Sequence, residues 1–189
     1  MTEAPKANEL ELNPKINEKF NFVEKILCEK LKVKEVNFKL IYKATRDGDS
    51  KEIFHSKCDN INNTLIIIKT NKNNIFGGFT TALWNVNNGF KYDTYSFLFS
   101  LNKNKIFSIK STFQWAISCW DNICISFGVS SDNTYELYIV NKFLSSYDNY
   151  VYNGLLYFDQ NDPAFILNDG MRNFMVEECE IYQVIPKIE

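Results

Sequence analysis

A chain of 189 residues, 45% of them hydrophobic, is long enough to fold as one domain with a sizeable core. Its 21 basic and 23 acidic residues give a net charge of −2 and are dispersed along the chain, so a nucleic-acid-binding protein, which gathers basic residues on one face, is not expected. The five cysteines include no CxxC pair and favour buried thiols in a reducing compartment over a disulfide framework.

The first 13 residues have no regular apolar spacing, and we expect a flexible tail there. They are polar and acidic, unlike a signal or transit peptide, and no apolar run in the chain is long enough to cross a bilayer. The sequence therefore predicts a soluble, cytoplasmic protein without membrane insertion.

An amphipathic helix is predicted over residues 14–35. Lys and Glu fill one side of it, and the other side carries apolar residues at helical spacing, namely Ile16, Phe20, Val23, Leu27 and Leu31. Pro14 suits the first helical position after Asn13. We expect this helix to cover a sheet, and a homodimer contact through residues 14–31 is the alternative.

Residues 36–189 have the pattern of strands separated by turns. Alternating apolar residues predict a half-buried strand from residue 36 to 43, which Arg46-Asp47-Gly48 ends. A short helix should follow, with Asp49 and Glu52 as its capping box. The stretch 64–101 then predicts three strands of an antiparallel meander.

Two features interrupt this meander. The pair Gly77-Gly78 indicates a bulge or a close approach of another group to the backbone. A polar loop carries Trp84 and runs to Asp93. Loops on a rigid scaffold are where binding residues concentrate, so this loop is a candidate contact for a partner.

The C-terminal half predicts four more strands, at 106–109, 123–129, 135–140 and 174–184. Between the last two lies a long polar and aromatic connection, 141–173, with few structural signals. Seven or eight strands with two helices near the start predict an α+β fold. We expect a sandwich of two antiparallel β-sheets flanked by a few helices, with an N-terminal amphipathic helix.

The candidate catalytic groups are few. His55 is the only histidine, so a catalytic Ser-His-Asp or Cys-His arrangement must use it, and His55-x-x-Cys58 lies on one helical turn. A zinc site needs two further ligands that no neighbouring pair supplies, and we expect neither a metal nor another cofactor. Glu178 and Glu180 share one face of the last strand; a solvated strand edge is favoured over a pair for acid–base chemistry.

A series of short motifs in a fixed order resembles a TLDc domain, and most of all its protist branch, over about residues 38–185. The motifs are Arg46-Asp47-Gly48, Phe54-His55-x-Lys57-Cys58-Asp59, Thr64-Leu65, IFGGFT at 75–80 with Trp84, SFLFSL at 96–101, and Phe174-x-Val176-x-x-x-Glu180-Ile181-Tyr182. Each motif alone is weak, and their combination is fairly specific.

The resemblance implies a two-sheet sandwich with flanking helices and a non-catalytic interaction module. It further implies a role in oxidative-stress protection and, as in several members, binding to the vacuolar proton-pumping ATPase and regulation of its assembly. The predicted partner-binding residues are Arg46, Asp47, His55, Asp59, Trp84, Asp93, Glu178 and Glu180. Two alternatives stay open: a redox-active protein or enzyme using Cys58 with His55, and a stress-responsive, transcription-associated factor.

Overall fold

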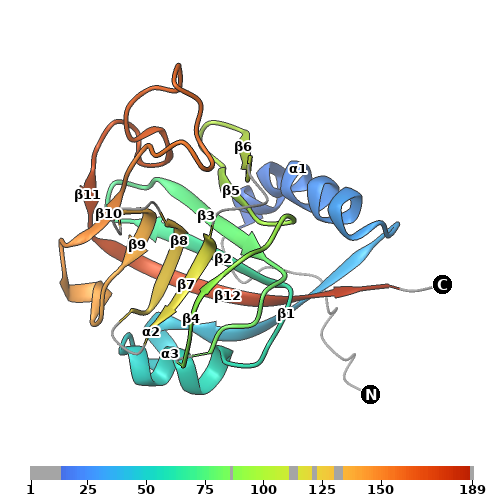
Figure 1. Cartoon of the computed structure of the whole chain (residues 1–189), viewed down its shortest axis with the longest axis horizontal. Helices are drawn as coiled ribbons and strands as arrows, with labels where there is room; N and C mark the ends of the chain where they lie inside the picture. Colours follow the sequence, from blue (N-terminus) through green and yellow to red (C-terminus); the bar gives the residue numbers. More distant parts are fainter. Residues whose placement is uncertain (1–13, 86, 111–114, 121–122, 130–133, 188–189) are drawn as a thin grey trace.

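A computed structural model describes residues 14–85, 87–110, 115–120, 123–129 and 134–187. Within these ranges the chain forms two antiparallel six-stranded sheets (Figure 1). The first sheet has the spatial order β1 (Val36–Lys43), β12 (Val176–Pro186), β2 (Thr64–Thr70), β3 (Ile75–Thr80), β5 (Phe97–Ser100) and β6 (Lys105–Ser108). The second has the order β11 (Asn173–Phe174), β10 (Asn149–Val151), β9 (Tyr135–Ile139), β8 (Ile125–Val129), β7 (Trp115–Trp120) and β4 (Asn87–Lys91).

The sheets pack against each other around one hydrophobic core, which confirms the predicted sandwich. Its central members come from both sheets and include Ile66, Ile68, Phe76, Leu98, Ile117, Phe127, Leu137 and Ile139. Strand β2 is buried along almost its whole length. Ile66 and Ile68 point into the sandwich and Leu65 and Ile67 join a second apolar cluster, so both faces of this strand are covered.

The helix α1 (Pro14–Leu31) covers the outer face of the first sheet (Figure 1), as predicted. Its buried residues Phe20, Val23 and Leu27 belong to the second cluster, together with Leu65, Ile67, Phe79, Phe97 and Phe99 from the sheet. Because this side of the helix packs on the sheet, a homodimer through 14–31 would have to use the other side, and it stays a prediction. The predicted tail, 1–13, lies outside the described residues.

Two short helices, α2 (Ala44–Asp47) and α3 (Lys51–Cys58), lie together at one end of the sandwich (Figure 1). Residues Arg46 and Asp47 therefore belong to a helical turn. The predicted cap of α3 was wrong, since the hydroxyl of Ser50 accepts from the backbone N–H of Ile53 at 3.3 Å. The Asp49 carboxylate instead accepts from the backbone N–H of Leu144 at 2.9 Å, because that loop packs beside the helix.

The glycine pair of β3 marks a close approach and not a bulge. Gly77 and Gly78 pair regularly with both neighbouring strands. A Cβ atom on Gly77 would lie 1.8 Å from the carbonyl oxygen of Ile66, and one on Gly78 would lie 2.7 Å from the ring of Phe127 in the opposite sheet. Glycine is therefore required where β3 meets its neighbouring strand and the second sheet.

Three stretches without a strong apolar pattern are structured. Strand β4 lies in the segment expected to be a polar loop, and β7 lies between residues 111 and 122, where no strand was predicted. The connection 141–173 contains β10, the 3-10 helices η1 (Phe143–Ser145) and η2 (Ile166–Asn168), and the start of β11. Among the described residues, no helix has both the length and the apolar composition that crossing a bilayer requires.

Candidate functional site

Three of the predicted partner-binding residues, Arg46, Asp47 and Glu178, lie at the surface around α2. We call this surface, together with the neighbouring Thr45, the α2 corner. The backbone N–H of Thr45 donates to the Glu178 carboxylate at 3.2 Å, and the Thr45 hydroxyl donates to the same carboxylate. The Arg46 guanidinium donates to both Asp47 oxygens, at 3.0 and 2.8 Å. The α2 corner thus joins residues that are more than 130 positions apart in the chain.

The charged groups of the α2 corner are held in place, and the Arg46 side chain is the most exposed of them. The hydrogen bond from Arg46, helped by the backbone N–H of Lys43, lowers the pKa of Asp47 to about 2. The pair is therefore fully ionised at neutral pH. Half of the Arg46 side chain remains exposed, so it can contact a partner while bound to Asp47.

Glu180 is not part of this surface, and the predicted solvated edge is wrong for it. Strand β12 lies between β1 and β2 and is not an edge, so Glu180 is completely buried. Its carboxylate lies 2.9 Å from the Lys43 ammonium and accepts from the Tyr182 hydroxyl at 2.5 Å. Such a group stabilises the sheet and presents nothing to a partner.

His55 and Asp59 form a pair at the end of α3. The Nδ1 atom of His55 lies 2.8 Å from the Asp59 carboxylate, and Nε2 lies 3.1 Å from the carbonyl oxygen of Ile123. Both ring nitrogens are engaged, and the ring is buried. His55 therefore joins α3 to the segment before β8, and the described residues contain no group of three His, Cys, Asp or Glu placed to hold a metal.

Cys58, the redox candidate, is a buried thiol of the core. Burial, with smaller effects from Asp59 and Asp47, raises its pKa. Burial likewise raises the pKa of Cys124 to about 12 and raises those of Cys119 and Cys179. The thiolate is the reactive form of cysteine, so these protonated thiols do not favour the redox alternative.

We expect Cys28 to react first with iodoacetamide in the folded protein, and the other four cysteines to react only after unfolding. Cys28 is partly exposed on α1, whereas the other four are buried. Mass spectrometry of peptides after short labelling, with and without denaturant, locates the modified residues. The variant Cys28→Ser should lose the fast labelling, and fast labelling of Cys58 in the folded protein would contradict the structure.

Trp84 was predicted to be a surface residue for a partner, and the structure places it in the core. The side chain is completely buried, and its indole N–H donates to the Thr64 hydroxyl at 2.8 Å. The ring packs edge-on against Phe54 and Phe127, at centroid distances of 5.5 and 6.0 Å. Trp84 thus links α3 to both sheets and has no exposed surface.

Asp93 is also buried and organises the two turns on either side of β4. Its carboxylate accepts from the hydroxyls of Thr80 and Thr81, at 2.7 and 2.8 Å. It also accepts from the backbone N–H groups of Thr81 and Tyr95, at 2.6 and 2.9 Å. Asp93 can affect a partner only through the shape of these turns.

The model of one protein family, the TLDc domain, matches residues 15–185. The chain belongs to the TLDc domain family. No curated protein matches the chain. The family match includes most of α1 together with both sheets, so the helix is part of the matched domain.

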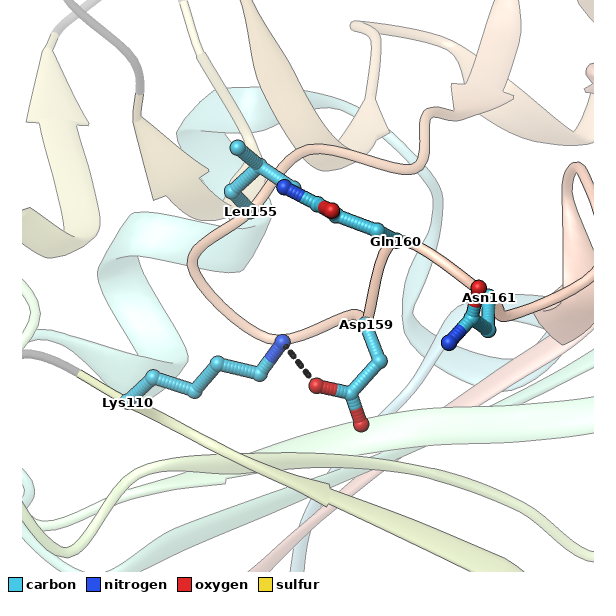
Figure 2. Close-up of a pocket in the computed structure, with 5 residues that line it drawn as sticks. All are labelled: Lys110, Leu155, Asp159, Gln160 and Asn161. Carbon is cyan, nitrogen blue, oxygen red and sulfur yellow. Dashed lines mark ion pairs between the residues drawn. The ribbon is translucent and has the colours of Figure 1, made fainter.

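The long connection 152–172 covers the other end of this TLDc domain and was not foreseen as an ordered feature. Three lysines on and beside β6 pair with three of its aspartates: Lys110 with Asp159, Lys105 with Asp162 and Lys103 with Asp169. A depression of about 430 Å³ lies on it, lined by Lys110, Leu155, Asp159, Gln160 and Asn161 (Figure 2). Its two charged groups neutralise each other across 2.8 Å, so it offers no free acid or base.

A buried carboxylate, Glu136 on β9, holds the same connection of the TLDc domain in place. Its two oxygens accept from the backbone N–H groups of Leu156 and Tyr157, at 2.8 and 2.9 Å. Burial outweighs these two hydrogen bonds and raises the pKa of Glu136 to about 7. No sequence pattern marked this residue, because its partners are backbone groups 20 positions away.

The raised pKa of Glu136 predicts a dependence of stability on pH. Its pKa lies above the 4.5 of the ordinary side chain, so its contribution to stability is complete below pH 4.5 and is lost as pH rises through about 7. We expect the free energy of unfolding of the wild type, relative to Glu136→Gln, to fall by at most about 3 kcal/mol over this range. Urea unfolding at several pH values measures it, and parallel profiles for the two proteins would contradict the assignment.

Proposed function

We propose that this TLDc domain is a non-catalytic interaction module of the cytoplasm that binds a larger protein assembly. The leading candidate is the vacuolar proton-pumping ATPase, and protection against oxidative stress is the proposed cellular role. The observation that supports binding most directly is the α2 corner, where the exposed Arg46 and the partly exposed Glu178 are fixed on a rigid sandwich.

Two physical properties make the α2 corner suitable for binding. Arg46 is already ordered by Asp47, so less side-chain entropy is lost when a partner binds. Charges of both signs, from the exposed Arg46 and the partly exposed Glu178, favour a partner surface with complementary charges and so provide specificity. The buried residues of the predicted set, including Trp84 and Glu180, contribute through the fold alone.

The test is capture of pump subunits from cell extract by the purified chain, together with the ATPase activity of isolated membranes. We expect Arg46→Ala to weaken capture by about fivefold or more, as for a charged residue at the centre of an interface. Arg172→Ala is the matched control, because Arg172 is exposed on the second sheet beside β11. Failure of the wild type to recover pump subunits, with unchanged pump activity, would exclude the pump as the partner.

A further inference from the structure

A second concave surface lies between the end of α1 and the turns on either side of β4. This groove has a volume of about 250 Å³ and is lined by Lys30, Leu31, Lys32, Thr81 and Tyr95. We call it the α1 groove. Sites that enclose whole small molecules usually measure about 300 to 1,000 Å³, so its size suits one or two side chains of a protein partner better.

One wall of the α1 groove is rigid because the buried Asp93 fixes it. Asp93 accepts three hydrogen bonds from the two groove residues of this wall, two from Thr81 and one from Tyr95. The Tyr95 side chain is 43% exposed and offers its ring to an incoming apolar group. A wall ordered in advance lowers the entropic cost of binding.

The other wall is the C-terminal end of α1. The helix closes with Lys32 in the left-handed conformation (φ 57°) and with the backbone N–H of Val33 donating to the carbonyl of Cys28 at 3.0 Å. The Lys30 ammonium lies 5.9 Å above the ring of Phe97, so the side chain runs along the sheet. Two lysines therefore flank the groove, and the Lys30 side chain is held against the sheet.

The charged groups near these two lysines bear on what the α1 groove can bind. Neither Lys30 nor Lys32 forms an ion pair with another described residue, whereas seven other lysines of the described chain do. Partial burial lowers the pKa of Lys30, and the more distant charges of Asp93 and Glu29 offset this only in part. An added carboxylate would therefore interact favourably with a partly desolvated ammonium.

We propose that the α1 groove binds an acidic segment of a protein partner. A carboxylate of that segment lies between Lys30 and Lys32, and a neighbouring apolar side chain packs against Leu31 and Tyr95. The inference rests on the proposed function, since it specifies the chemistry of the partner of an interaction module.

The experiment uses two fluorescein-labelled peptides and the full chain. One peptide contains Leu, Phe, Asp and Glu, and the other has the same sequence with Asn and Gln at the acidic positions. Fluorescence anisotropy measures the dissociation constant of each peptide. We expect the wild type to bind the acidic peptide at least tenfold more tightly than the neutral one. The variant Lys30→Glu/Lys32→Glu should bind the acidic peptide at least tenfold more weakly than the wild type.

Two further variants separate the groove from general charge effects. Lys57→Glu/Lys72→Glu makes the same change of net charge at exposed positions on α3 and in the turn between β2 and β3, and should bind like the wild type. Tyr95→Ala keeps both lysines and should weaken binding about threefold through the lost apolar contact. Circular dichroism and thermal unfolding show whether each variant is folded.

Equal affinity of the wild type and Lys30→Glu/Lys32→Glu for the acidic peptide would overturn the proposal, as would equal affinity of the wild type for both peptides. The proposal would also be overturned if sedimentation equilibrium showed that the wild type is a dimer and Lys30→Glu/Lys32→Glu is a monomer. That result would assign the groove to a second copy of the chain. Failure to capture pump subunits, with peptide discrimination intact, would reject only the pump. Capture without peptide discrimination would reject only the groove.

Discussion

Replacement of Gly77 by alanine is expected to lower the free energy of unfolding by more than about 4 kcal/mol, enough to unfold many domains of this size. The added Cβ would lie 1.8 Å from the carbonyl oxygen and 2.8 Å from the carbonyl carbon of Ile66. Both are backbone atoms of the adjacent strand β2, which can move only if the ladder between β2 and β3 is broken. Urea unfolding followed by circular dichroism measures the loss.

Two other glycines serve as comparisons for Gly77. In Gly78→Ala the new Cβ would meet the ring of Phe127 at 2.7 Å, and because a side chain can shift, we expect a smaller loss of about 1–3 kcal/mol. In Gly170→Ala no atom lies within 4 Å of the new Cβ. Only the positive φ of 86° then lowers the free energy of unfolding, by about 1 kcal/mol. If Gly77→Ala is no less stable than Gly170→Ala, the close approach of β2 and β3 is incorrect.

Removal of the buried carboxylate in Glu180→Ala is expected to lower the free energy of unfolding by about 3 kcal/mol. Breaking a buried ion pair typically costs roughly 3–5 kcal/mol, and the lower end applies because Lys43 keeps 22% of its side chain exposed. The substitution removes the carboxylate that faces the Lys43 ammonium and accepts the Tyr182 hydroxyl. Thermal and urea unfolding measure the effect.

The matched control lies three residues earlier on the same strand. Glu177 is exposed, and its carboxylate pairs with Lys69 at 2.9 Å on the surface. Glu177→Ala should change the free energy of unfolding by less than about 1 kcal/mol, as exposed ion pairs do. Similar losses for the two variants would show that Glu180 is not buried. If Glu180→Ala binds a partner poorly at one temperature but normally at a lower temperature where it is folded, the defect is caused by lost stability and not by a lost contact.

Local pairs within the candidate site were accessible from the sequence, and distant ones were not. Arg46 and Asp47 are neighbours in the chain, and His55 and Asp59 are one helical turn apart. The contact between Thr45 and Glu178 depends on β12 crossing the sheet beside β1. Nothing in the local pattern around Glu178 indicates which strand lies next to it.

The local sequence pattern also did not predict which polar and aromatic side chains are buried. Trp84 stands in a polar stretch, and its indole is buried because α3 and both sheets meet there. Glu180 stands among other glutamates, and it is buried because β12 is inserted between β1 and β2. The three Lys–Asp pairs that hold the connection 152–172 join β6 and its flanks to residues about 50 positions or more away.

The sequence by itself determined the strand β2, the apolar side of α1, the α+β class and the likeness to the TLDc family. These features depend on periodicity, on unbroken apolar runs and on short motifs, each of which directly reflects which faces of an element must leave water. Only the tertiary structure decided the order of strands in the two sheets and, with it, which charged groups are exposed. Burial of an individual side chain depends on the elements packed above it, and those elements come from distant parts of the chain.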